Sequence, residues 1–208
     1  MILFVKKALP ALVLLAVAVG LSSCYLPARF DCEIELTREG YYKVFFSGYV
    51  VDARMYADLK HGKLTPAQEG KAVQQLQADI TRDPSASDFG YIRDGYFRMK
   101  WHREGDLLKA KSVTFLRRNE TFFTIDYNKD THVVKIQGRS LSTEQKDRLV
   151  KEGLNMNGQF RVITDAKVIY NNADTTKDFP ARGPRTKVYI WQIPNIYRAT
   201  PKMQISLR

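Results

Sequence analysis

The sequence predicts an α+β fold, mainly an antiparallel curved sheet or open barrel, with two helices. Segments that alternate apolar and polar residues recur along the 208-residue chain, and this is the period of half-buried strands. Most are separated by short turns, which make neighbouring strands antiparallel. Two other segments have helical spacing and begin at capping boxes. The strands are too numerous for one flat sheet, so we expect a curved or partly closed one.

An N-terminal hairpin is the first predicted unit. Apolar and polar side chains alternate from Phe30 to Leu36, and a second strand, rich in aromatic and β-branched residues, covers Tyr41 to Val51. Gly40, in the turn between them, can adopt a positive φ. Residues 24–29, which precede the hairpin, are expected to be a short tether.

The first helix is predicted from Thr65 to about Thr81. Thr65 can cap it, Pro66 suits its first position, and Gln68 completes a capping box. Apolar residues then repeat at helical spacing, namely Val73, Leu76 and Ile80.

The second helix is predicted to begin at Ser142, with Gln145 completing its capping box. Gly153 is placed to end it. Leu149 and Val150 are expected to face inward.

Four strands are predicted between the helices as a meander. They cover residues 89–102, 107–116, 121–127 and 132–137. The turns between them are placed at Glu104–Asp106, Arg117–Glu120 and Asn128–Asp130. Such short connections predict that consecutive strands pair with each other.

The last third of the chain is predicted to contain further strands around a polar loop. Strands are expected at 159–164, 167–170 and 187–193, and the alternation of residues 202–208 predicts a strand at the C-terminus. The polar loop covers residues 171–185 and contains two prolines.

Residues 1–23 have the parts of a secretory signal peptide: a positive start with Lys6 and Lys7, a short apolar stretch, and small residues before the cleavage point. The leader ends in Leu21-Ser22-Ser23-Cys24, which resembles the lipobox of bacterial lipoproteins. The resemblance implies that Cys24 is lipidated and becomes the first residue of a single mature domain, 24–208. The alternative is a secreted protein in which Cys24 forms a disulfide with Cys32.

Lipidation of Cys24 would attach the chain to a membrane, stably if two or more acyl chains are present. In this class of lipoproteins an Asp after the cysteine is the usual signal for retention at the inner membrane. Tyr25 stands there instead. We therefore expect a lipid-anchored protein of the bacterial cell envelope, at the outer membrane and facing the periplasm. Cys32 would then be the only free thiol. It could be reactive, form a disulfide between two chains or, as a strand residue, be a small buried hydrophobe.

The charge balance is basic. Removal of the leader with its two lysines lowers the formal net charge from +11 to +9. Nucleic acid is not an expected partner of an exported, anchored protein. An anionic lipid surface or another anionic envelope component is a candidate, and the alternative is a charge that only confers solubility.

The densest basic stretch extends from Arg93 to Arg118. Within it, Arg98 and Lys100 share one face of a predicted strand, and Lys109 and Lys111 share a face of the next. Cross-strand pairing would merge these four into a patch that binds phosphate or carboxylate groups. The alternative is a solvated outer face.

No motif for catalysis, metal binding or a cofactor is present. The three histidines, His61, His102 and His132, lack metal-ligand spacing. The sequence contains no Gly-x-Ser-x-Gly, no P-loop and no Gly-x-Gly-x-x-Gly. We therefore expect neither enzymatic activity nor a cofactor.

The order of elements resembles the LppM-type lipoprotein domain: a lipidated cysteine, a hairpin, a helix, and a late strand-loop-strand segment. The late part comprises Gly158–Thr164 and, after the polar loop, Val188–Ile193 with Trp191. The resemblance implies a curved β-rich domain with helices, associated with envelope lipid and without known enzymatic chemistry.

Two functions remain open at this stage. The first is non-enzymatic binding of anionic lipid or another envelope component by a lipid-anchored protein. The second is a structural role as a subunit of an envelope protein complex. An open cavity lined by the aromatic residues of the 41–51 and 187–193 strands would favour binding, and a filled core with a flat apolar outer patch would favour assembly.

Overall fold

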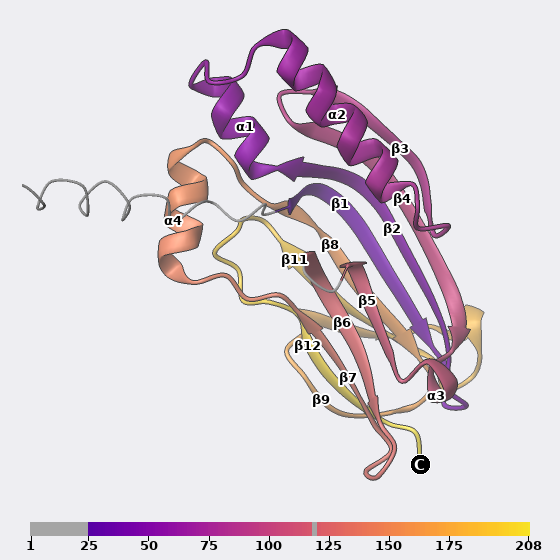
Figure 1. Cartoon of the computed structure of the whole chain (residues 1–208). Helices are drawn as coiled ribbons and strands as arrows, with labels where there is room; N and C mark the ends of the chain where they lie inside the picture. Colours follow the sequence, from indigo (N-terminus) through magenta and orange to yellow (C-terminus); the bar gives the residue numbers. More distant parts are fainter. Residues whose placement is uncertain (1–24, 118–119) are drawn as a thin grey trace, which may run out of the picture.

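A computed structural model describes residues 25–117 and 120–208 (Figure 1). The predicted leader and Cys24 lie outside the described residues, so the lipidation of Cys24 stays a prediction. Cys32 is a free, buried thiol. Among the described residues no helix is long and apolar enough to cross a membrane.

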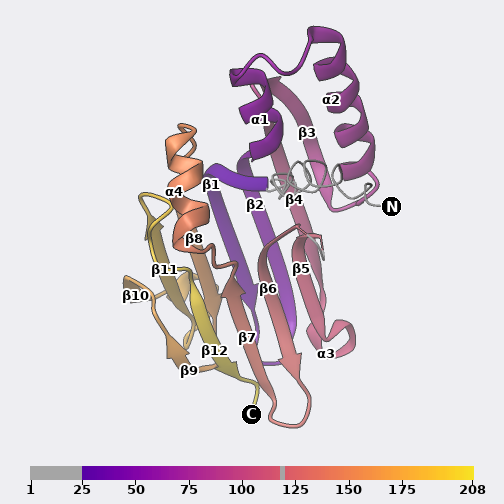
Figure 2. The same cartoon turned by 60° about the vertical axis from the view of Figure 1, so that its left-hand side comes forward.

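The strands form two sheets, which confirms the mainly antiparallel α+β prediction (Figures 1 and 2). The large sheet has the order β10 (Thr175–Asp178), β11 (Lys187–Ile193), β8 (Asn157–Thr164), β1 (Tyr25–Leu36), β2 (Tyr41–Asp52), β4 (Tyr96–Asp106) and β3 (Ala86–Arg93). The small sheet has the order β5 (Ser112–Arg117), β6 (Glu120–Asn128), β7 (Val133–Gly138), β12 (Lys202–Ser206) and β9 (Lys167–Asn171). Among the described strands, only β1 and β8 are paired in parallel.

The main hydrophobic core lies between the two sheets and is rich in aromatic rings. Phe115 of β5 packs against Phe46 of β2, with ring centroids 4.7 Å apart, and against Trp101 of β4 at 4.8 Å. Phe123 of β6 contacts Phe160 of β8 at 5.6 Å. These rings join strands that are far apart in the sequence, and burying them excludes water from the facing sides of both sheets.

The predicted N-terminal hairpin is confirmed, but the predicted tether is wrong. β1 begins at Tyr25, and Leu26 and Ala28 are buried. Leu26 packs in a second, smaller core with Leu149. These apolar side chains extend the strand, and a shift of register between Pro27 and Phe30 accommodates the proline. The described chain therefore has no free spacer after residue 24.

Both capping boxes are present. Thr65 caps α2 (Pro66–Ile80) and exchanges hydrogen bonds with Gln68, and Ser142 does the same with Gln145 for α4 (Thr143–Lys151). Leu149 is buried as predicted. The inward orientation predicted for Val150 is wrong, because its side chain is 40% exposed.

Two helices were not predicted, α1 (Ala53–Lys60) and the single turn α3 (Leu107–Ala110). Each begins directly after a strand, and an aspartate caps its N-terminus, Asp52 for α1 and Asp106 for α3. Both helices are too short to show a helical repeat of apolar residues in the sequence. A 3₁₀ turn, η1 (Pro180–Arg182), lies in the late polar segment.

The predicted meander is wrong in its first half. The stretch predicted as one strand is a hairpin, β3 and β4, which turns at Asp94 and Gly95, both with positive φ. β4 continues through Glu104–Asp106, where a turn was predicted, and α3 then carries the chain into the small sheet. The second half is confirmed, since β5, β6 and β7 pair as consecutive antiparallel strands.

The end of the chain also crosses between the sheets. Residues 165–166 connect β8 of the large sheet to β9 of the small one. The predicted polar loop contains the edge strand β10, which pairs with β11. The α1, α2 and α4 helices gather toward one end of the molecule, and α3 and the C-terminus lie at the other (Figure 1).

A candidate binding cleft between the sheets

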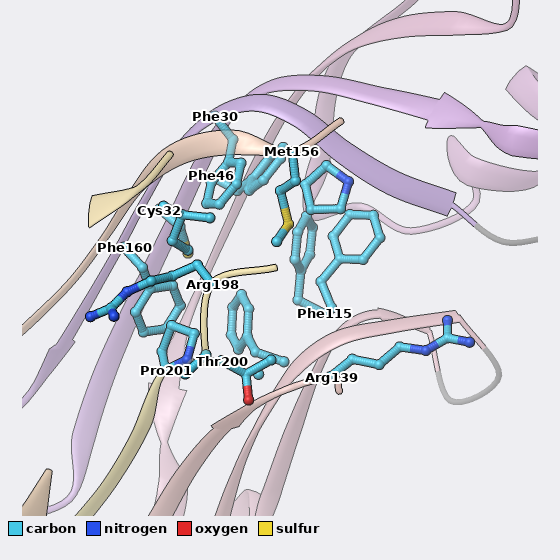
Figure 3. A pocket seen from close by; sticks show the side chains of 16 residues that line it. Phe30, Cys32, Phe46, Phe115, Arg139, Met156, Phe160, Arg198, Thr200 and Pro201 are labelled. Carbon is cyan, nitrogen blue, oxygen red and sulfur yellow. The ribbon is translucent and has the colours of Figure 1, made fainter. Parts of the chain in front are cut away.

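An apolar cleft opens between the two sheets, with an interior volume of about 60 Å³. Aromatic side chains dominate its lining, and Met156 and Ile193 add further apolar surface (Figure 3). The six phenylalanines that line it are Phe30, Phe46, Phe115, Phe122, Phe123 and Phe160. The condition that favours ligand binding over assembly is met by one of the two strands: Phe46 of β2 lines the cleft, whereas β11 contributes Ile193 and neither Tyr189 nor Trp191.

Phe30 reaches the cleft because glycines stand on both sides of it. Gly48 of β2 and Gly158 of β8 are its direct partners in the two neighbouring strands. A Cβ on Gly158 would lie 2.4 Å from the backbone oxygen of Phe30, and a Cβ on Gly48 would lie 2.8 Å from the Cβ of Phe30. The two glycines therefore create the room in which the Phe30 ring lies on the sheet.

A second compartment, also about 60 Å³, continues the cleft toward the start of β1. Tyr25, Leu26 and Ile196 line it, and Met156 belongs to both compartments. The first described residue of the chain is therefore part of the cleft wall. A group attached to the residue before Tyr25 would therefore lie next to the second compartment.

Three cations surround the two compartments: Arg139, Lys146 and Arg198. Arg198 forms an ion pair with Asp174. Neither Arg139 nor Lys146 has an ion pair or a side-chain hydrogen bond with any residue that the structure describes. The guanidinium groups of Arg139 and Arg198 point outward from the ring cluster (Figure 3). The cleft thus combines an apolar interior with two positive charges at its rim that no described residue compensates.

Cys32 lines the cleft and is 1% exposed. Burial raises the pKa of its thiol far above the usual value. The thiol is therefore neutral and contributes apolar surface, in agreement with the prediction of a small buried hydrophobe.

The four cations predicted to form a basic patch are not brought together on adjacent strands. Arg98 and Lys100 lie on β4 and both face Asp88, at 2.8 and 3.8 Å. Lys109 lies in α3, and Lys111 follows it as the C-terminal cap. The strand that was to carry these two lysines begins only at Ser112, so the predicted cross-strand pairing is wrong.

The histidines are also separate from one another. His61 is hydrogen-bonded to Glu152 at 3.0 Å, His102 stacks on Phe45 with centroids 4.3 Å apart, and His132 contacts Tyr127. Within residues 25–117 and 120–208, no group of three His, Cys, Asp or Glu side chains is arranged to hold a metal ion.

Sequence reasoning missed the rim cations of the cleft. Arg139 follows β7, Lys146 lies in α4, and Arg198 lies between β11 and β12. No local pattern connects three positions this far apart. The aromatic lining was partly visible in the sequence, because most of its phenylalanines occupy positions of predicted strands that face inward.

The chain was compared with known families, curated proteins and solved structures. No family model and no curated protein matches the chain. The structure is similar to the NMR structure of the folded domain of LppM from Mycobacterium tuberculosis, with a TM-score of 0.45 and 12% sequence identity. The similarity covers 90% of this chain and 94% of that domain.

Proposed function

We propose that this protein is a lipid-anchored, non-enzymatic protein of the bacterial envelope that binds an anionic amphiphile in the cleft between its sheets. The observation that carries the proposal is an apolar cleft with two cations at its rim, Arg139 and Lys146, that no described residue compensates. An apolar chain would occupy the interior, and a phosphate or carboxylate head would meet the cations.

The volume of the cleft limits how much of a chain can enter. A water-sized group needs about 10–15 Å³ of such space, so one compartment of about 60 Å³ holds roughly four to six methylene-sized groups. At about 0.8 kcal/mol per CH₂, this burial contributes roughly 3–5 kcal/mol. The cleft therefore suits the end of an acyl chain, and deeper entry requires movement of side chains such as Met156.

The position of Tyr25 supports a membrane-related role. Because Tyr25 lines the second compartment, a lipid on Cys24 would hold this compartment close to the bilayer surface. An amphiphile would then pass from the membrane into the cleft over a short distance.

Binding can be tested with a form of the protein that begins at Tyr25, which retains every described element. The measurement is co-sedimentation with phosphatidylcholine vesicles that contain or lack phosphatidylglycerol. We expect binding only with the anionic lipid. The double substitution Arg139→Gln/Lys146→Gln should weaken it roughly thirtyfold, at about 1 kcal/mol per cation.

The matched control is Arg98→Gln/Lys100→Gln, which removes the same charge from the outer face of β4. We expect it to bind as the parent does. An equal loss in both double variants would mean that net charge alone drives binding and would refute the role of the cleft. Mass spectrometry of the purified protein for bound lipid gives an independent readout.

An assembly role is the second candidate, and one observation favours it. β9 is an edge strand of the small sheet, and its Ile169 and Tyr170 are each 49% exposed. Exposed apolar residues on an unpaired edge are suited to strand addition by a partner chain. Replacing Ile169 with lysine should abolish such an assembly, measured by light scattering, and leave binding to vesicles unchanged.

A further inference from the structure

A second hollow, separate from the cleft, lies beside α1, with a volume of about 520 Å³. Residues from β1 to β4 contribute to it, together with α1 and the segment that follows α4. Its lining includes three tyrosines, Tyr49, Tyr56 and Tyr96, together with Arg29 and Asn157. We call this hollow the tyrosine groove. Its volume is in the range of small-ligand sites, whereas the apolar cleft is much smaller.

The walls of the tyrosine groove are held in place by packing and hydrogen bonds. Tyr56 and Tyr96 meet edge to face, with ring centroids 6.0 Å apart, and both pack on the smaller hydrophobic core. The wall formed after α4 is tied to α1, because Lys60 Nζ donates to the backbone oxygen of Glu152 at 2.8 Å. Gly153 has a φ of +90° and lies under the hydroxyl of Tyr56. The groove is therefore built before a ligand arrives.

Some polar groups of the groove have partners: Arg93 and Asp94 form an ion pair at 3.8 Å, and the amide oxygen of Asn155 accepts hydrogen bonds from two backbone N–H groups. Five others have none within the described part of the chain. The hydroxyls of Tyr49, Tyr56 and Tyr96 make no hydrogen bond there, and neither does the amide of Asn157. Arg29, which lies directly opposite Asn157 in the pairing of β1 with β8, has no ion pair with a described residue. These donors and acceptors thus remain available to a ligand.

From this arrangement we infer that the tyrosine groove binds a saccharide that carries an acidic group. A pyranose ring has apolar C–H faces and a rim of hydroxyls, and tyrosines offer both an apolar ring face and a hydroxyl. The free amide and hydroxyls match the sugar hydroxyls, and the uncompensated guanidinium of Arg29 matches a carboxylate or phosphate on the sugar. This inference does not depend on lipid binding in the cleft.

Isothermal titration calorimetry on the full-length chain in a non-ionic detergent tests the inference. The probe is a hexamer of mannuronate, with isomaltohexaose as the neutral comparison. We expect the acidic hexamer to bind at least tenfold more tightly than the neutral one. Arg29→Gln should weaken binding of the acidic hexamer about tenfold, and Tyr49→Ala about fivefold.

The control for Tyr49→Ala is Tyr41→Ala on the same strand. Tyr41 is 61% exposed and lies at the far end of β2, outside the groove, so its removal should leave binding unchanged. Absence of binding to the mannuronate hexamer, or an equal loss in the two tyrosine variants, overturns the inference. Inorganic phosphate that binds as tightly as the hexamer also overturns it, because the site would then recognise a simple anion.

Discussion

The substitution Gly158→Ala provides a direct test of how the cleft is built. A Cβ at this position would lie 2.4 Å from the backbone oxygen of Phe30 and 2.6 Å from its Cδ1. β1 and β8 would have to separate by roughly 0.6 to 1 Å to restore ordinary contact, because the first of these atoms belongs to the backbone. Such overpacking typically costs about 1–3 kcal/mol, and more where the backbone must move. We expect about 3 kcal/mol.

The assay is urea unfolding of the form that begins at Tyr25, followed by circular dichroism. The matched control is Gly90→Ala, in β3 of the same sheet, where a Cβ would meet nothing within 4 Å. This control should be neutral or stabilising by up to about 1 kcal/mol, because alanine restricts the unfolded chain. If Gly158→Ala unfolds at the same urea concentration as Gly90→Ala, the account of Phe30 packed between two glycines is wrong.

Three further predictions concern single groups. Asp83→Ala should destabilise the fold by about 1–3 kcal/mol, because the indole nitrogen of Trp101, which is 1% exposed, donates to Asp83 at 2.9 Å. Desolvation raises the pKa of Asp83, but its hydrogen bonds outweigh this effect and hold the pKa below its usual value. The stability difference between the parent and the variant should therefore shrink as the pH falls below about 4, measured by acid unfolding. Burial and the hydrogen bond to Glu69 raise the pKa of Tyr91 to about 12. The protonated phenol therefore stabilises the folded protein fully below about pH 10, and this stabilisation is lost as the pH rises toward 12. Glu69→Gln should lower the pKa of Tyr91, measured by an absorbance titration. Cys32 should react with a thiol reagent at pH 8 only after the protein is unfolded, because it is buried and its pKa is raised; rapid reaction of the folded form would contradict the packing of β1.

The candidate sites were less accessible to sequence reasoning than the elements that carry them. The basic stretch around Arg98 stood out in the sequence, yet Asp88 neutralises part of it in the structure. Arg139 and Lys146 did not stand out, because an isolated cation in a sequence does not indicate whether an anion lies near it. Charge compensation depends on residues that folding brings together, and a linear pattern does not show which residues these are.

The sequence by itself determined most of the local structure. The alternation from Phe30 to Leu36, the positive φ of Gly40 and the two capping boxes after Thr65 and Ser142 are all present in the structure. These features depend on neighbours a few residues away, and such interactions are visible in a linear pattern.

Only the tertiary structure decided which sheet each strand joins. A period of two shows that one face of a strand is buried, but it does not show what covers that face. The helical turn capped by Asp106, and the positive φ of Lys111 after it, send the chain from one sheet to the other, where a direct hairpin was expected. Phe46 and Phe115 therefore face each other from opposite sheets, and the cleft that forms beside them exists only because of that crossing.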